Sequence, residues 1–75
     1  MTRLWLGVGS EHNVAANDIK GCVLGETGVP AESVGNIDIR ERHSFVDVAA
    51  AAAAGIIAKL NRANLAGQRL KAKVA

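Results

Sequence analysis

Two short segments of this chain alternate between inward-facing and outward-facing types of side chain, and this period of two constrains the fold most strongly. In the first segment, Trp5 and a glycine separate the aliphatic residues Leu4, Leu6 and Val8. Successive side chains of a β-strand point to opposite faces, so the aliphatic set can line a core while the other set faces away from it. We therefore expect a strand over about residues 3–8, with the Trp5 ring on its outer face.

The second segment, at about residues 43–48, follows the same rule. Val46 and Val48 are expected to point inward together with Ser44, so that His43 and Phe45 point outward. Both strands then carry rings on one face of a sheet, among polar and charged neighbours. Rings in such a setting suit stacking on unpaired nucleic-acid bases.

The rest of the apolar pattern completes an α+β fold. We expect helices over about 16–27 and 50–61, the second favoured by six consecutive alanines, and further strands over about 36–40 and 69–74. The resulting order is βαββαβ. Both helices must cover the apolar side of the sheet if the other side carries the rings. This gives a ferredoxin-like two-layer sandwich, a four-stranded antiparallel sheet with two helices on one face.

The expected core residues share an apolar side chain and an inward position on one of these elements. They are Leu4, Leu6, Val8, Ile19, Cys22, Val23, Ile37, Ile39, Val46, Val48, Ile56, Ile57, Leu60, Leu70 and Val74. A chain of 75 residues forms one domain, residues 1–75, with a net stability of a few kcal/mol. Gly21 and Gly25 weaken the first helix by about 1 kcal/mol each relative to alanine. We expect them to allow close packing on the sheet.

Composition argues against several classes of function. The single cysteine, Cys22, cannot form an internal disulfide, and neither a second cysteine nor a nearby histidine gives the spacing of a zinc site. We therefore expect no metal, no cofactor, no catalytic residues and a cytoplasmic location. No apolar stretch approaches 18 residues and no signal peptide is visible, which argues against a membrane or secreted protein.

Charge is distributed unevenly along the chain, whose net charge is +2. Every acidic residue lies at or before Asp47, and residues 48–75 carry only basic charges. This asymmetry favours a polyanionic partner, although a merely solvated face would look the same. Asp38 and Asp47 are expected beside the rings, where they would repel phosphate. The candidate binding residues are Trp5, His43 and Phe45, the cations Arg3, Arg40, Arg69, Lys71 and Lys73 on the same face, and Arg42 at its edge.

The ring-bearing strands resemble those of RNA recognition motifs, which stack bases on aromatic rings of two central strands. Part of the longer signature of that family is filled by His43, Ser44, Phe45 and Val46. Three positions depart from it, namely Glu41, Arg42 and Val48. The match to a generic RNA recognition motif is therefore partial.

A closer resemblance covers nearly the whole chain. Its residues lie at 4–9, 18–21, 28–30, 34–40, 43–48 and 67–74, and the run Gly35-Asn36-Ile37-Asp38-Ile39 is especially characteristic. The chain thereby resembles the DbpA-type RNA-binding domain at the C-terminal end of bacterial DEAD-box RNA helicases. The resemblance implies an atypical RNA recognition motif, monomeric when isolated, that tethers a helicase core in cis to structured RNA, in particular ribosomal RNA during ribosome biogenesis.

The same resemblance implies that residues 1–75 come from a longer ATP-binding hydrolase. The sequence contains neither a phosphate-binding loop nor an Asp-Glu-Ala-Asp run, so we expect the fragment itself to be non-catalytic. An alternative stays open, because the same two-layer topology also serves protein-interaction domains and small-molecule regulatory domains. Dimerisation that buries Trp5 and Phe45 would favour that alternative.

Overall fold

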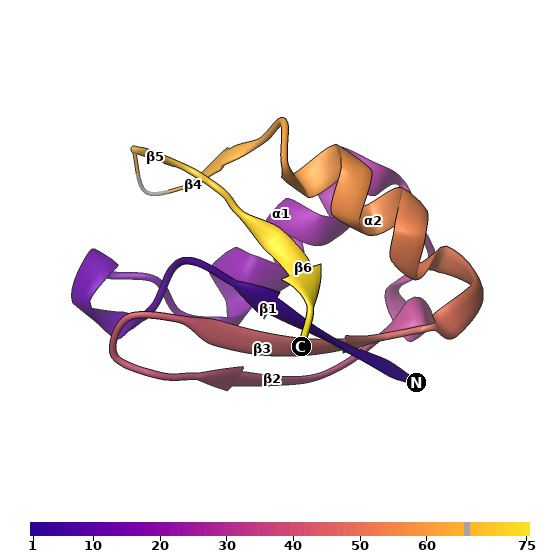
Figure 1. Ribbon diagram of the computed structural model, residues 1–75, viewed down its shortest axis with the longest axis horizontal. Coiled ribbons are helices and arrows are strands. Elements are labelled where there is room, and N and C mark those ends of the chain that lie inside the picture. The colour runs from indigo at the N-terminus through magenta and orange to yellow at the C-terminus, as the bar shows by residue number, and fades with distance from the viewer. Residues whose placement is uncertain (66) are drawn as a thin grey trace.

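Four strands of the computed structural model form an antiparallel sheet in the order β2-β3-β1-β6. The strands are β1 (Thr2–Leu6), β2 (Val34–Ile39), β3 (Ser44–Val48) and β6 (Ala72–Val74). Both α-helices lie on one side of this sheet, as Figure 1 shows. The structure describes residues 1–65 and 67–75. The two-layer βαββαβ fold expected from the sequence is confirmed.

The helices begin and end at residues with clear local signals. Helix α1 spans Ala16–Thr27; the Asp18 carboxylate accepts a hydrogen bond from the Ala15 N–H (2.9 Å) at its start, and Gly28 ends it in the left-handed conformation (φ 70°). Helix α2 spans Ala53–Leu60 and is shorter than expected. The alanines before it form the 3₁₀ helix η3 (Ala50–Ala52), and two further 3₁₀ turns are η1 (Ser10–His12) and η2 (Ala31–Ser33).

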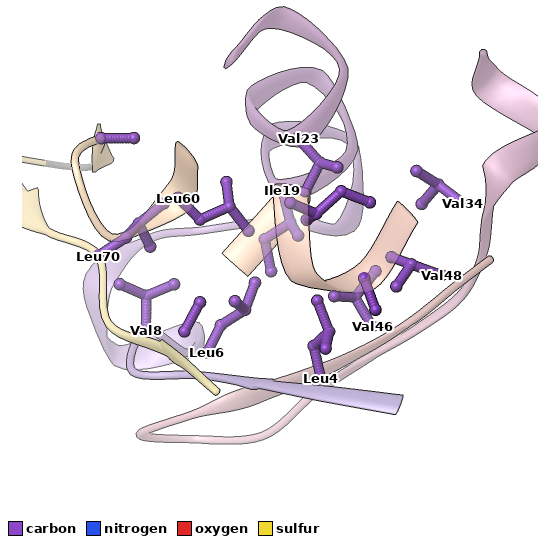
Figure 2. Packing of buried hydrophobic residues seen from close by; sticks show 14 of the residues in the cluster. Leu4, Leu6, Val8, Ile19, Val23, Val34, Val46, Val48, Leu60 and Leu70 are labelled. Atoms are coloured by element: carbon purple, nitrogen blue, oxygen red, sulfur yellow. The ribbon is translucent and has the colours of Figure 1, made fainter. Parts of the chain in front are cut away.

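The hydrophobic core lies between the sheet and the two helices (Figure 2). Strand residues supply one side of it and helix residues the other, and the most deeply buried are Leu4, Leu6, Val8, Val46, Val48, Ile19, Val23, Ile56, Leu60 and Leu70. All of these were expected in the core. Four other expected core residues, Cys22, Ile37, Ile39 and Ile57, are only partly buried against it.

Some predictions about packing are wrong. Val74 pairs with Leu4 but is 58% exposed, because it lies at the end of an edge strand near the end of the chain. Gly21 and Gly25 do not mediate close packing, since a Cβ added at either would meet no atom within 4 Å. The sequence interpretation also missed three buried residues that lie outside its expected strands and helices, Val14, Val34 and Ala63.

The loop after β1 is hydrogen-bonded to the turn between β2 and β3. The N–H groups of Ser10 and Glu11 donate to the carbonyl oxygens of Arg40 (2.8 Å) and Glu41 (2.9 Å). A Cβ at Gly9 would collide with these same backbone groups, so only glycine permits this approach. The contact fixes the end of the sheet at which His43 lies.

The expected last strand, 69–74, is divided in the structure. Strands β4 (Asn64–Leu65) and β5 (Gln68–Arg69) form a separate hairpin, which lies on the helix side of the large sheet in Figure 1. The Asn61 side chain then donates to the Ala72 carbonyl (3.1 Å) and accepts from the Ala72 N–H (3.0 Å). It thereby covers part of the outer edge of β6 as a neighbouring strand would.

Candidate nucleic-acid interface

The open face of the sheet carries three aromatic rings, and the His43 ring is paired with each of the other two. Trp5 on β1 and Phe45 on β3 are opposite each other in register, and both alternate with core residues, so they point away from the helices. The His43 ring is stacked with the Trp5 ring (centroids 6.2 Å apart, planes at 22°) and meets the Phe45 ring edge to face (5.2 Å, 82°). We call Trp5, His43 and Phe45 the aromatic platform; the orientation expected from the sequence is confirmed.

Gly7 supports this platform, and the sequence interpretation did not assign it that role. A Cβ at Gly7 would lie 3.3 Å and 3.4 Å from two carbons of the Trp5 indole, so the indole lies across the strand at this position. The Gly7 N–H also donates to the carbonyl oxygen of Lys71 (3.0 Å), which keeps β1 close to the chain before β6. The available signal was a glycine two residues after Trp5, which places both on the same face.

Two cations lie over the rings. Lys73 is opposite Trp5 on β6, with its Nζ 4.9 Å from the centre of the indole, and the Arg3 guanidinium carbon lies 5.6 Å from the centre of the Phe45 ring. Both distances are within the range of cation–π attraction. The open face therefore places positive charge directly beside the surfaces on which a base could stack.

Carboxylates neutralise some of these cations and leave others free. Arg3 is paired with Asp47 (3.1 Å), and Arg40 with Asp38 (2.8 Å). Within the described part of the chain, neither Lys71 nor Lys73 has a carboxylate within 4 Å. The uncompensated positive charge of the open face thus lies on its β6 side, and the acidic groups Asp38 and Asp47 lie toward β2 and β3.

The remaining candidate cations are farther from the platform. Arg42, in the turn between β2 and β3, lies 3.7 Å from the carboxylate of Glu11. Arg69 was expected on the ring-bearing face, but it belongs to β5, and its Nε donates to the Asn61 carbonyl at the end of α2 (3.3 Å). The prediction is wrong because Arg69 belongs to β5, and residues 70 and 71 separate β5 from β6. The alternation of side chains along β6 therefore does not extend back to Arg69.

Two reactive side chains outside the aromatic platform are Cys22 and His12. Burial, and next the neighbouring Glu26 carboxylate, raise the pKa of the Cys22 thiol, which favours its unreactive neutral form. His12 accepts the Gly9 N–H at Nδ1 (3.1 Å) and so stabilises its own loop. Among residues 1–65 and 67–75 no three metal-ligating side chains gather. No helix in this same part of the chain is long and apolar enough to cross a membrane.

Comparisons with known proteins concern the family and the fold of the chain. The family model described as "DbpA RNA binding domain" matches residues 3–74. A solved structure, "Structural insights into cis element recognition of non-polyadenylated RNAs by the Nab3-RRM", superposes with a TM-score of 0.79 at 17% sequence identity, over 99% of this chain and 93% of that chain. The latter shows an RRM-like fold. No curated protein matches the chain.

Proposed function

Because this chain belongs to the DbpA RNA-binding domain family, we propose that it binds RNA through the open face of its sheet. Bases stack on the aromatic platform, and phosphates are held by the lysines on the β6 side. The observation that carries this proposal is the clustering of three rings on one open face, where His43 pairs with both Trp5 and Phe45, with Lys73 in register beside Trp5. Rings and free cations in this arrangement are typical of surfaces that bind single-stranded RNA.

The binding free energy requires both base stacking and phosphate contacts. Stacking contributes about 1 to 3 kcal/mol per base, so two stacked bases supply at most about 6 kcal/mol. Micromolar affinity requires about 8 kcal/mol. Lys71 and Lys73 can supply the difference, because they give up no carboxylate partner when they bind phosphate. Arg3 and Arg40 contribute less, since each must first leave its aspartate.

The cations over the rings suggest how binding proceeds. A base that stacks on Trp5 takes the position of the Lys73 ammonium, which then turns toward the phosphate of the same nucleotide. Arg3 and Phe45 can act in the same way. One cation thus stabilises the free platform and then the bound RNA.

We further propose that this domain anchors a DEAD-box RNA helicase to structured RNA, ribosomal RNA during ribosome biogenesis being the best candidate. Family membership supports this proposal. In such a protein the helicase core supplies ATP hydrolysis, and the domain supplies affinity and position.

The test is a titration of labelled ribosomal RNA fragments by fluorescence anisotropy at two salt concentrations. We expect Trp5→Ala to weaken binding by about 5- to 150-fold, the equivalent of one stacked base. Lys73→Ala should weaken binding of all RNAs and reduce the slope against salt by about 0.7 to 0.9. Lys59→Ala, an exposed cation on α2, is the matched control. Unchanged affinity in both Trp5→Ala and Lys73→Ala would contradict the proposal.

A further inference from the structure

One row of side chains crosses the open face from an acidic residue on β2 to a lysine on β6. In register from β2 to β6 it contains Asp38, Phe45, Trp5 and Lys73. Neighbouring strands are about 4.8 Å apart, so each residue of the row is next to the following one. A nucleotide on this row has a preferred direction, because its phosphate is attracted to the uncompensated charge of Lys73, whereas Arg40 offsets the charge of Asp38. The base stacked on Phe45 therefore turns its free edge toward Asp38.

The Asp38 carboxylate is paired with Arg40 through one of its oxygens, which leaves the other oxygen available. Both Nε (3.1 Å) and a terminal nitrogen (2.8 Å) of Arg40 donate to the same oxygen, Oδ2. In the described part of the chain, Oδ1 has no hydrogen-bond partner, and the side chain is 41% exposed. An ionised carboxylate only accepts hydrogen bonds, so this group requires a donor on the ligand.

We propose that Asp38 determines base specificity by selecting guanine for the position stacked on Phe45; this inference rests on the RNA binding proposed above. The Watson–Crick edge of guanine presents two adjacent donors, N1–H and the N2 amino group. Adenine, cytosine and uracil each place an acceptor beside their donor on that edge, which a carboxylate repels. Guanine is therefore the base whose edge complements Asp38 best.

Asp47 provides a matched control on the same face. It too is a carboxylate paired with an arginine, through Oδ1 and the Nε of Arg3 (3.1 Å). It lies opposite Arg3 in the next row, however, and not beside Phe45 on the neighbouring strand. Substituting either aspartate frees one arginine, so both variants change the charge of the face equally. Only Asp38→Asn changes the group beside Phe45, where it replaces one acceptor oxygen with an amide donor and removes the charge.

The experiment measures a ratio of affinities. Labelled oligouridylate octamers are prepared with one central guanosine, with inosine, which lacks the N2 amino group, or with uridine only. We expect the wild-type domain to bind the guanosine octamer about tenfold more tightly than either of the others, because only guanine offers two adjacent donors to Oδ1; about tenfold lies within the discrimination that contacts to a base edge give. Asp38→Asn should bring this ratio close to one, and Asp47→Asn should preserve it.

The two proposals fail in different ways. If the wild-type domain shows no guanosine preference, or if Asp38→Asn retains it, the role of Asp38 is refuted while RNA binding stands. If Trp5→Ala and Lys73→Ala bind these octamers as well as the wild-type domain does, the binding face itself is wrong, and the role of Asp38 falls with it. Thermal unfolding of each variant verifies that it is folded.

Discussion

The two faces of strands β1 and β3 are made by alternate residues of the same short segments, and they differ in almost every property. On the helix side, Leu4, Leu6 and Val46 are at most 1% exposed and join one core. On the open side, Trp5 and Phe45 are half-buried, contact His43 and lie beside charged residues. The comparison teaches that one face supplies the buried core, while the other is free to supply the binding that we propose, so substitutions on the two faces should have separable effects.

The largest difference is expected between Leu4→Ala and Trp5→Ala. Leu4 is fully buried, and its truncation should lower the free energy of unfolding by about 2 to 5 kcal/mol, much of the stability of a small domain. Trp5→Ala should cost less than half as much, because the indole is only half-buried and lies on the open face, outside the core between the sheet and the helices. Urea denaturation followed by circular dichroism measures both, and equal losses would show that the open face is a second core.

A smaller effect is expected at Ser44, the one polar residue among the described residues of the buried set. Its hydroxyl donates to the carbonyl oxygen of Val8 (2.6 Å), so Ser44→Ala should leave that buried acceptor without this partner and cost about 1 to 3 kcal/mol. Ser10→Ala, at an exposed position, should change stability by less than about 0.5 kcal/mol. If Ser44→Ala and Ser10→Ala have the same free energy of unfolding, the Ser44 hydroxyl does not stabilise the helix side of the sheet.

The smallest effect on stability is expected for Gly7→Ala on the open face. The new methyl group would lie 3.3 Å from the Trp5 ring, which can shift by a few tenths of an ångström, so stability should change by less than about 1 kcal/mol. The fluorescence of Trp5 and the affinity for RNA should nevertheless change. Gly25→Ala, where a Cβ meets nothing within 4 Å, should leave the Trp5 emission as it is. An unchanged spectrum in Gly7→Ala would mean that this glycine does not position the indole.

Much of the fold could be predicted because its signals are local. The alternation around Trp5 and Phe45 determines which side chains face the helices, and Gly28 marks the end of α1. Predictions failed where a distant part of the chain decides the outcome. Arg69 was assigned to the ring-bearing face by extending an alternation that the β4–β5 hairpin interrupts, and Val74 was assigned to a core that does not reach the end of β6.

The same distinction holds for the candidate site. Trp5, His43 and Phe45 could be found from their expected positions in two strands, but the pairing of the His43 ring with both other rings could not. The pairing of Arg3 with Asp47 joins residues 44 positions apart, and only strand register brings them together. This pairing changes the ranking of the cations, since it leaves Lys71 and Lys73 as the free charges beside the rings.

The sequence by itself determined the two-faced character of the strands, because the direction of a side chain in a strand depends only on its position along it. It also determined the charge asymmetry and the family resemblance. Only the tertiary structure decided which residues of different strands stand side by side. Register, the close approach at Gly9 and the row from Asp38 to Lys73 all depend on pairing between distant segments, and no local pattern encodes that pairing.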